Sequence, residues 1–200
     1  MVGEIRDKET ADLAVQAALT GHVVLSTIHT NSAAGVLPRL LDMGVEPFLV
    51  ASTINTVIGQ RLVRRICAKC KEEYKSTPAE TKSIRDSLDN ILPKNEKEMG
   101  HAKEDLGYDI IPLAGVDSYN LFRGKGCNEC TKGYKGRSGI YEVFGISDAV
   151  EKLLTNHAST SELQKQAQLD GMVTMRQDGY LKALNGVTTT SEVARVASEI

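Results

Sequence analysis

The stretch TGHVVLSTIHTN, at residues 20–31, decides the fold class of this 200-residue chain. Its centre, residues 22–28, is β-branched and nearly uncharged, which is typical of a strand buried on both faces of a parallel sheet. Residues 9–20 before it have apolar side chains at helical spacing, with Asp7 as an N-cap and Gly21 just past the end. Further predicted elements are helices over 33–43 and 47–58 and a strand over 60–66. This alternation predicts an α/β fold with helices packed on a parallel sheet.

The composition argues against several classes of protein. A formal net charge of −2 gives no electrostatic basis for binding nucleic acid. No apolar run of about 18 residues occurs, so the sequence predicts no membrane span. Residues 1–9 contain three acids and no apolar core, unlike a signal peptide. We therefore expect a cytoplasmic protein, in which thiols stay reduced.

Two Cys-x-x-Cys pairs carry the strongest chemical signal, and their members are Cys67, Cys70, Cys127 and Cys130. Two such turns present four thiolates to one metal, and four protein ligands close the site, so the pattern predicts a structural zinc site. Disulfides are disfavoured by the reducing compartment, and a redox pair needs only one such motif. The intervening residues 71–126 form a long insertion, but the entropic cost of loop closure grows only logarithmically. We expect the surrounding lysines to offset the thiolate charge; these are Lys69, Lys71, Lys125 and Lys132.

The chain as a whole is predicted to divide into three regions, namely residues 1–66, 67–139 and 140–200. Within the second, residues 71–105 are charged and poorly periodic, which indicates either a solvated helical insertion or a mobile loop. Short strands are predicted at 108–113, 118–122 and 139–144. The third region is predicted to be mainly helical, with a helix starting at Ser147, another over 175–184, and capping boxes at Ser159/Glu162 and Thr189/Glu192.

Glu4 and His29 are the candidate catalytic residues. Each follows an apolar stretch, and the carboxyl ends of parallel strands meet at one edge of a sheet, where ligands bind. A carboxylate there can hold magnesium or orient an attacking water, and a histidine can hydrogen-bond a phosphate oxygen. The alternatives stay open: Glu4 as an ordinary loop acid or helix cap, and His29 in a polar turn before the next helix.

Taken in order, several segments resemble the secretion ATPase superfamily of type II secretion and type IV pilus assembly. GEIRD at 3–7, followed by ETA at 9–11, looks like its Walker B segment, and residues 20–31 look like its histidine box. QRLVR at 60–64 and residues 126–142 look like the entry and exit of its zinc subdomain. Its closing helical region is matched at 171–172, 178–179 and 186–189. The resemblance covers nearly the whole chain.

The resemblance implies the C-terminal part of a RecA-like P-loop NTPase core, with a tetracysteine zinc subdomain and a helical C-terminal region. It implies a homo-hexameric motor that uses Mg-ATP and acts with an inner-membrane platform protein, as a peripheral protein at the cytoplasmic face. Carried over, Glu4 is the catalytic glutamate, His29 is the nucleotide-sensing histidine, and the four cysteines bind zinc. The cysteines favour the assembly branch, because pilus-retraction ATPases generally lack them.

One part of the family pattern is missing. The loop that grips phosphates, Gly-x-x-x-x-Gly-Lys-Ser/Thr, does not occur in the 200 residues. We therefore expect this chain to be part of a longer protein, and to bind ATP weakly and turn over little by itself. The alternative is a nucleotide-independent, zinc-stabilised adaptor that docks on a membrane platform protein. A zinc-ribbon nucleic-acid binder is contradicted by the net charge.

Two smaller groups of residues are also open to interpretation. Gln60, Arg61, Arg64 and Arg65 fit contact with a neighbouring subunit or nucleotide, and equally fit a solvated strand face. Tyr141 and Glu142 are predicted to pack beside the zinc region.

Overall fold

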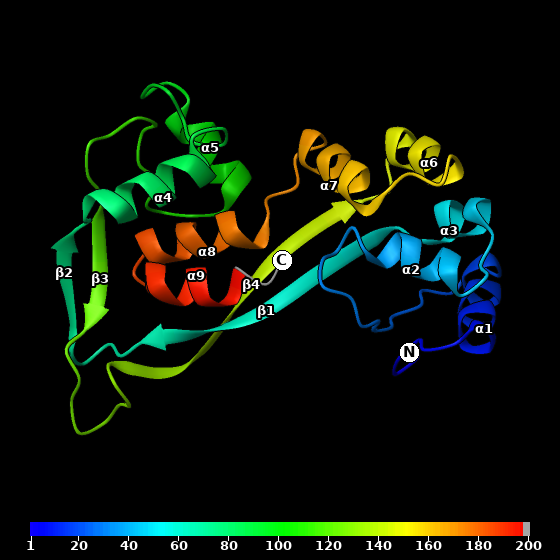
Figure 1. Cartoon of the computed structure of the whole chain (residues 1–200), viewed down its shortest axis with the longest axis horizontal. Coiled ribbons are helices and arrows are strands. Elements are labelled where there is room, and N and C mark those ends of the chain that lie inside the picture. The colour runs from blue at the N-terminus through cyan, green and yellow to red at the C-terminus, as the bar shows by residue number, and fades with distance from the viewer. Residues whose placement is uncertain (198–200) are drawn as a thin grey trace. The chain divides into compact units, whose positions relative to one another are not determined.

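The computed structural model describes residues 1–197, which form nine helices and four strands. Two compact units are present: one contains Met1–Gly59 and Glu142–Val173, and the other contains Gln60–Tyr141 and the described residues from Thr174 onward. The last three residues of the predicted region 140–200 lie outside the described chain. In chain order (Figure 1), the elements are α1 Lys8–Leu19, α2 Val36–Asp42, α3 Pro47–Thr53, β1 Thr56–Ile66, β2 Lys71–Lys75, α4 Pro78–Leu88, α5 Met99–Leu106, β3 Asn120–Gly124, β4 Tyr134–Gly145, α6 Asp148–Thr155, α7 Thr160–Leu169, α8 Met175–Leu184 and α9 Thr190–Ala197.

Helix α1 in the first unit begins and ends where the sequence predicts. The Asp7 side chain accepts a hydrogen bond from the Thr10 N–H at 2.8 Å, which satisfies one of the unpaired donors of the first turn. At the other end Gly21 has a φ of +89°, a conformation that favours glycine. Helix α1 shares a core with the other four helices of this unit and with parts of β1 and β4; its buried members include Ala11, Leu37, Val50, Val57, Phe144, Leu154 and Leu163.

Residues 22–28 do not form the doubly buried strand that their composition predicts. The Val2 N–H bonds Leu25 O and the Ile5 N–H bonds Thr27 O, both at 2.9 Å. The two bonds are three residues apart along the first segment but only two residues apart along the second. The pairing is therefore irregular, and no strand is assigned. Val23 is 88% exposed and Leu25 is 64% exposed, so the predicted burial is wrong for this chain. A residue pattern indicates that a segment suits a buried strand, but neighbouring elements decide whether it is covered.

The helices that follow are shorter than predicted. The predicted helix over 33–43 starts at Val36, because residues 32–35 form a turn in which the Gly35 N–H bonds Ser32 O at 3.2 Å. Pro47 occupies the first turn of α3, as predicted, but α3 ends at Thr53 rather than near residue 58. The next residues include Thr56, Val57 and Ile58, whose β-branched side chains favour a strand, and β1 begins there.

The strands form antiparallel ribbons, so the predicted parallel sheet is not found among the assigned strands. Strand β1 pairs with β4, and their arrows point in opposite directions in Figure 1. Strand β2 pairs with β3 in an antiparallel register that sets Lys71 opposite Gly124. The predicted strand at 139–144 is part of the longer β4, and the one at 118–122 corresponds to β3.

Residues 71–105 contain a strand and two helices, so the helical interpretation of this charged segment is confirmed and the mobile loop is not. Helix α4 starts with a complete capping box between Thr77 and Glu80, and it buries Ile84 and Leu88. Helices α4 and α8 pack together. By contrast, residues 108–113 are not a strand. The backbone N–H and C=O of Ile110 bond the Asn185 side chain, which replaces a strand partner.

Helices α6 and α7 begin at the capping residues that the sequence predicts. Ser147 caps α6, and Ser159 and Glu162 form both halves of the predicted capping box of α7. Helix α8 has the predicted bounds. At α9 the Glu192 N–H bonds the Thr189 hydroxyl at 3.3 Å, but the Glu192 carboxylate accepts from Arg64 and Arg195 instead of completing the box. Across residues 1–197, no helix has the length and apolar character needed to cross a membrane.

Candidate metal centre and acid–histidine pair

The four cysteine sulfur atoms come together in the second unit, all within 4.8 Å of one another. Each Cys-x-x-Cys forms a tight turn: the Cys70 N–H bonds Cys67 O, and the Cys130 N–H bonds Cys127 O, both at 3.3 Å. The predicted meeting of the two distant pairs is therefore confirmed, and the long insertion between them folds as β2, α4, α5 and β3.

The sulfur geometry fits a tetrahedral metal. Sγ–Sγ distances are 3.9 Å for Cys67–Cys127, 3.7 Å for Cys70–Cys130 and 3.6 Å for Cys127–Cys130. A tetrahedron with Zn–S bonds of about 2.3 Å has S–S edges of about 3.8 Å. Disulfide sulfurs would lie about 2.05 Å apart, and all four thiols are free. The residues present can therefore hold a metal ion.

Two glycines allow the chain segments on either side of the second cysteine turn to approach each other. A Cβ on Gly124 would lie 2.2 Å from Gly133 O, and a Cβ on Gly133 would lie 2.3 Å from Gly124 O. Gly133 also has a φ of +83°, and its carbonyl accepts from the Cys67 N–H at 2.9 Å. The backbone at residue 124 therefore crosses the backbone at residue 133 so closely that neither position has room for a side chain.

The thiols have different environments. Burial raises the pKa of Cys70 to about 11. A hydrogen bond from the Cys127 N–H, 3.2 Å from the Cys130 sulfur, lowers the pKa of Cys130 to about 7. A bound cation favours the thiolate at every ligand, so it would remove this difference.

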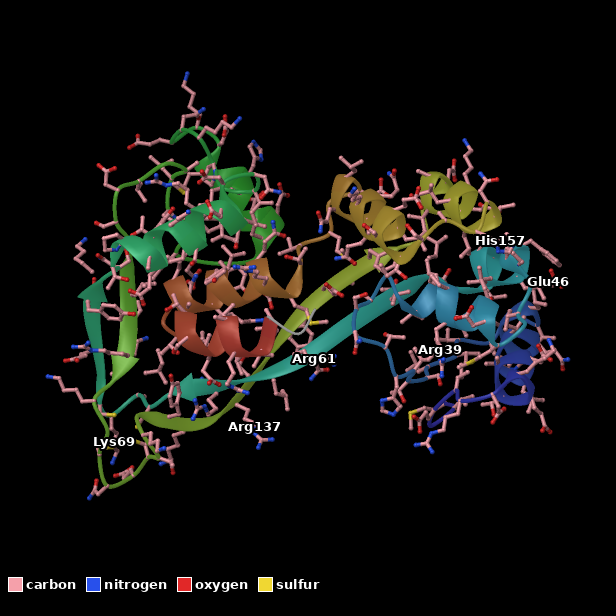
Figure 2. The ribbon with its side chains drawn as sticks, in the orientation of Figure 1. Arg39, Glu46, Arg61, Lys69, Arg137 and His157 are labelled. Carbon is pink, nitrogen blue, oxygen red and sulfur yellow. The ribbon has the colours of Figure 1, made fainter. Side chains whose placement is uncertain are left out.

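Three of the four lysines near the cysteines have partners other than the thiols. Lys69, labelled in Figure 2, pairs with Glu129. Lys125 pairs with Glu72 at 2.7 Å. The Lys71 ammonium lies 4.2 Å from the centre of the Phe122 ring. These three cations contact carboxylates and an aromatic face, and the expectation that the lysines offset the thiolate charge stays a prediction.

Glu4 and His29 meet in the first unit, as the sequence predicts. Glu4 Oε1 lies 2.5 Å from His29 Nε2, and Glu4 Oε2 lies 2.7 Å from Arg6 Nε. The hydrogen bond from Arg6 is the main cause that lowers the pKa of Glu4, and His29 adds to it. The Thr27 hydroxyl donates to Gly3 O at 2.8 Å, so the two segments are also joined next to the pair. The result is an ionised carboxylate beside an imidazole at an exposed edge.

Sequence reasoning predicted Glu142 to pack beside the zinc region and missed its contact with the turn that follows His29. Glu142 is 1% exposed, and its Oε1 accepts from the Ala33 N–H at 2.5 Å. The partners are 109 positions apart, so only the folded structure relates them. The signal available in the sequence was an acid inside an alternating apolar strand.

Arg64 belongs to the group of basic residues whose role was left open. Its Nη2 lies 2.6 Å from Glu192 Oε1, and its guanidinium stacks 4.2 Å from the centre of the Tyr134 ring. These contacts belong to the second unit itself, and they explain Arg64 without a neighbouring subunit or a nucleotide. Tyr141 is partly exposed and its N–H bonds Asp178 Oδ2 at 2.8 Å.

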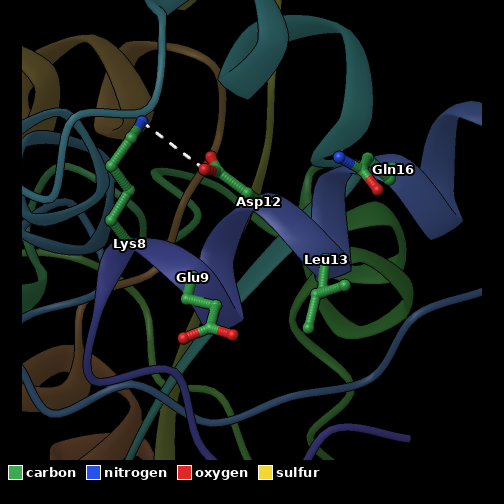
Figure 3. A pocket seen from close by; sticks show the side chains of 5 residues that line it. All are labelled: Lys8, Glu9, Asp12, Leu13 and Gln16. Carbon is green, nitrogen blue, oxygen red and sulfur yellow. Dashed lines mark ion pairs between the residues drawn. The ribbon is translucent and has the colours of Figure 1, made fainter.

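A surface hollow runs along α1 (Figure 3). Its lining comes entirely from that helix, through Lys8, Glu9, Asp12, Leu13 and Gln16. Lys8 and Asp12, one turn apart on this helix, pair at 3.5 Å. Binding sites bring polar groups together from several elements, which this hollow does not do.

Comparison with solved structures defines the class of fold. The chain is similar to the X-ray structure of the Legionella pneumophila ATPase DotB, with a TM-score of 0.56 and 19% identity, over 100% of this chain and 38% of that one. The Yersinia pseudotuberculosis ATPase DotB gives a TM-score of 0.57 at 15% identity, over 99% and 36%. The fold is therefore α/β, as predicted, and it is shared with part of each of these two ATPase structures.

Comparison of sequences gives the family. Residues 1–195 match the family described as Type II/IV secretion system protein, and the chain belongs to it. It is 44% identical to "Type II secretion system protein E" of Pseudomonas aeruginosa, over 100% of this chain and 34% of that protein. It is 40% identical to "Type IV pilus assembly ATPase PilB" of the same organism, over 100% and 31%. The chain thus spans about a third of the length of these curated relatives.

Proposed function

We propose that this chain is the C-terminal part of an ATP-hydrolysing motor that powers type II protein secretion or type IV pilus assembly. The observation that supports it best is the family match over residues 1–195, with relatives named for both processes. The Glu4–His29 contact agrees with the proposal, because it sets an ionised carboxylate beside an imidazole at one edge of the first unit.

In this proposal Glu4 is the catalytic glutamate and His29 the nucleotide-sensing histidine. Mg-ATP, when bound, supplies the phosphoanhydride that is hydrolysed. The Glu4 carboxylate is held by Arg6 on one oxygen and lies beside His29 on the other. In the proposed mechanism it accepts a hydrogen bond from an attacking water. His29 is largely exposed and can donate a hydrogen bond to a phosphate oxygen.

The four cysteines are proposed to hold one structural zinc ion. Four protein ligands leave no position for water or substrate, so the metal would stabilise the turns at 67–70 and 127–130 rather than take part in chemistry. Their presence favours the assembly branch of the family. The proposed division of the chain is an ATPase-core part at residues 1–66, a zinc-binding part at 67–139 and a helical part at 140–200.

The partners are proposed from the family. The motor would act as a homo-hexamer, cytoplasmic and peripheral at the inner membrane, and would contact a platform protein of the pilus or secretion machine. The chain has no phosphate-gripping loop, so we expect it to hydrolyse little ATP by itself. That same sequence feature favours the second candidate, a zinc-stabilised adaptor that needs no nucleotide.

The test joins this chain to the upstream two thirds of the Pseudomonas aeruginosa type II secretion protein and measures ATP hydrolysis. Glu4→Gln should lower kcat by about 10²–10⁴-fold, the usual contribution of a positioned acid or base. Glu46→Gln, an exposed acid just before α3 in the same unit, is the matched control and should keep the parent rate. A joined protein that hydrolyses ATP equally fast with Glu4→Gln would contradict the catalytic assignment. One that binds platform protein without any hydrolysis would favour the adaptor.

A further inference from the structure

The buried carboxylate of Glu142 contacts the turn that follows His29. Its side chain is among the largest fully buried ones of the described chain, although it lies on β4 between apolar residues. A buried carboxylate is unfavourable unless its oxygens receive hydrogen bonds. Here Oε1 accepts a hydrogen bond from the Ala33 N–H at 2.5 Å, so this oxygen has a buried donor. A hydrophobic residue would fill the position without this requirement, so the acid calls for a specific explanation.

The turn itself, residues 30–35, is fixed internally by short-range bonds. The Thr30 hydroxyl donates to Ser32 O at 2.9 Å, and the Gly35 N–H reaches both the carbonyl and the hydroxyl of Ser32 at 3.2 Å. These bonds set the shape of the turn. They do not set its place against the rest of the first unit. Ala33 is buried in the core of that unit, and its N–H points to Glu142, so this long-range bond anchors the turn.

His29 depends on such an anchor because its own side chain is poorly packed. The ring is 85% exposed, yet Nε2 lies 2.5 Å from Glu4. With little side-chain packing, the position of the ring follows from the backbone on either side. The Thr27–Gly3 bond fixes the backbone before His29. The turn bound by Glu142 fixes the backbone after it.

We propose that Glu142 is a positioning residue for His29. It holds the turn 30–35 through the Ala33 N–H, and thereby keeps the imidazole beside Glu4. The catalytic consequence rests on the proposed function, whereas the positioning itself does not. The residue acts from the part of β4 that belongs to the first unit, as do Ala33 and His29.

The chemistry of the acceptor decides how substitutions behave. A glutamate side chain offers only acceptors to the N–H. Glutamine keeps one acceptor oxygen of the same reach but brings two N–H groups that need partners. Methionine has a similar length and no comparable acceptor. Glu142→Gln should therefore preserve much of the anchor, and Glu142→Met should remove it while still filling the space.

Nuclear magnetic resonance on the chain tests the positioning directly. In the parent the Ala33 amide proton should resonate far downfield. Glu142→Met should move it upfield and should also shift the ring resonances of His29, with Glu142→Gln in between. Glu192→Gln, another buried acid of the chain, is the matched control and should leave both sets of signals in place. Unchanged His29 ring signals in a folded Glu142→Met chain would overturn the proposal, even if the Ala33 signal moves.

ATP hydrolysis by the joined protein separates this proposal from the function on which it rests. Glu142→Met should lower kcat by about tenfold or more and change KM less than about twofold, because misplacement of a catalytic group affects the chemical step. Glu142→Gln should recover most of the rate. If His29→Ala is slow while Glu142→Met is as fast as the parent, the positioning role is wrong and the ATPase site stands. If His29→Ala is as fast as the parent, the ATPase assignment of His29 is wrong, and the resonance shifts alone decide on Glu142.

Discussion

Arg64 Nη2 lies 2.6 Å from Glu192 Oε1, although the two residues are 128 positions apart. The Glu192 side chain is 2% exposed, and it also accepts from the Arg64 N–H at 3.1 Å and from two nitrogens of Arg195 at 2.9 Å. One buried carboxylate therefore has four donors, and the two from Arg64 hold α9 against β1. A buried acid with this many charge-assisted bonds stabilises the fold only while it is ionised.

Acid should weaken this contact between β1 and α9. The hydrogen bonds from Arg195 and then Arg64 hold the pKa of Glu192 far below its ordinary value of 4.5, against the opposing effect of burial. Because the folded-state pKa is lower, the folded chain binds fewer protons than the unfolded chain. The stability from Glu192 is fully present above pH 4.5 and is lost as the pH falls below it. Urea unfolding from pH 7 to pH 3 should show this loss.

Glu192→Gln should abolish that part of the acid dependence. At pH 7 it should lower the free energy of unfolding by about 1–3 kcal/mol, the usual effect of leaving charged partners without their acceptor. Glu104→Gln changes an exposed acid on α5 and should leave both the stability and its pH dependence nearly unchanged. If Glu192→Gln unfolds with the parent's full acid dependence, other carboxylates cause it.

The cysteine cluster predicts about one zinc ion per chain in protein prepared without chelator. Cys67→Ser and Cys127→Ser, one from each turn, should each remove it, because three thiolates bind far less tightly than four. Elemental analysis measures the metal, and thermal unfolding with and without chelator measures the stability it adds. Lys69→Ala is the control, since Lys69 pairs with Glu129 and should not affect zinc. Metal-free parent protein would show that the cluster is not a zinc site.

Local signals in the sequence predicted the parts of the fold that depend on neighbouring residues. The cap at Asp7, the box at Ser159 and Glu162 and the bounds of α8 are all confirmed. In each case the hydrogen bond that ends or starts the helix joins residues only a few positions apart, so residue order alone determines it. The meeting of the two cysteine pairs was predictable for another reason, because metal chemistry requires four ligands at one point.

Features that depend on distant partners were not predictable in this way. Nothing local shows that Glu142 will meet Ala33, or that Glu192 will bond Arg64 instead of completing its capping box. Residues 22–28 have a strand composition, but their cover and pairing come from other segments, and here the pairing is irregular. The meeting of Glu4 with His29 was predicted from the resemblance and from parallel strand ends, although neither segment is assigned as a strand.

Gly133 should tolerate substitution less well than Gly126, which lies just before the second cysteine turn. Alanine at 133 would face both a positive φ and a backbone oxygen at 2.3 Å, whereas at Gly126 it would face only the positive φ of +94° in open space. Gly126→Ala should therefore cost about 1–2 kcal/mol. Gly133→Ala should cost more and lower zinc affinity as well. Chelator competition and thermal unfolding compare the two, and equal effects would contradict the close backbone crossing seen at Gly124.

Substitution of Asp178 should destabilise the segment after α5 more than it destabilises α8, the helix that carries Asp178. Its Oδ1 accepts from the Tyr108 hydroxyl, and its Oδ2 accepts from the Tyr141 N–H at 2.8 Å and from Lys182 at 2.5 Å. Burial and the neighbouring Asp178 raise the pKa of Tyr108, so its hydroxyl is protonated and can donate at neutral pH. Asp178→Asn keeps the shape but places an amide against donors, and should lower the free energy of unfolding by about 1–3 kcal/mol.

Tyr108→Phe removes only one of these bonds and should lower the free energy of unfolding by about 1 kcal/mol. Hydrogen exchange should locate the change. With Tyr108→Phe, protection should fall around residues 107–111, where Asn185 holds the Ile110 backbone, and should remain in α8. With Asp178→Asn it should also fall at the Tyr141 N–H, because that donor loses its charged acceptor. If Asp178→Asn left the exchange of both Tyr141 and residues 107–111 unchanged, Asp178 would not be the group that holds this segment to α8.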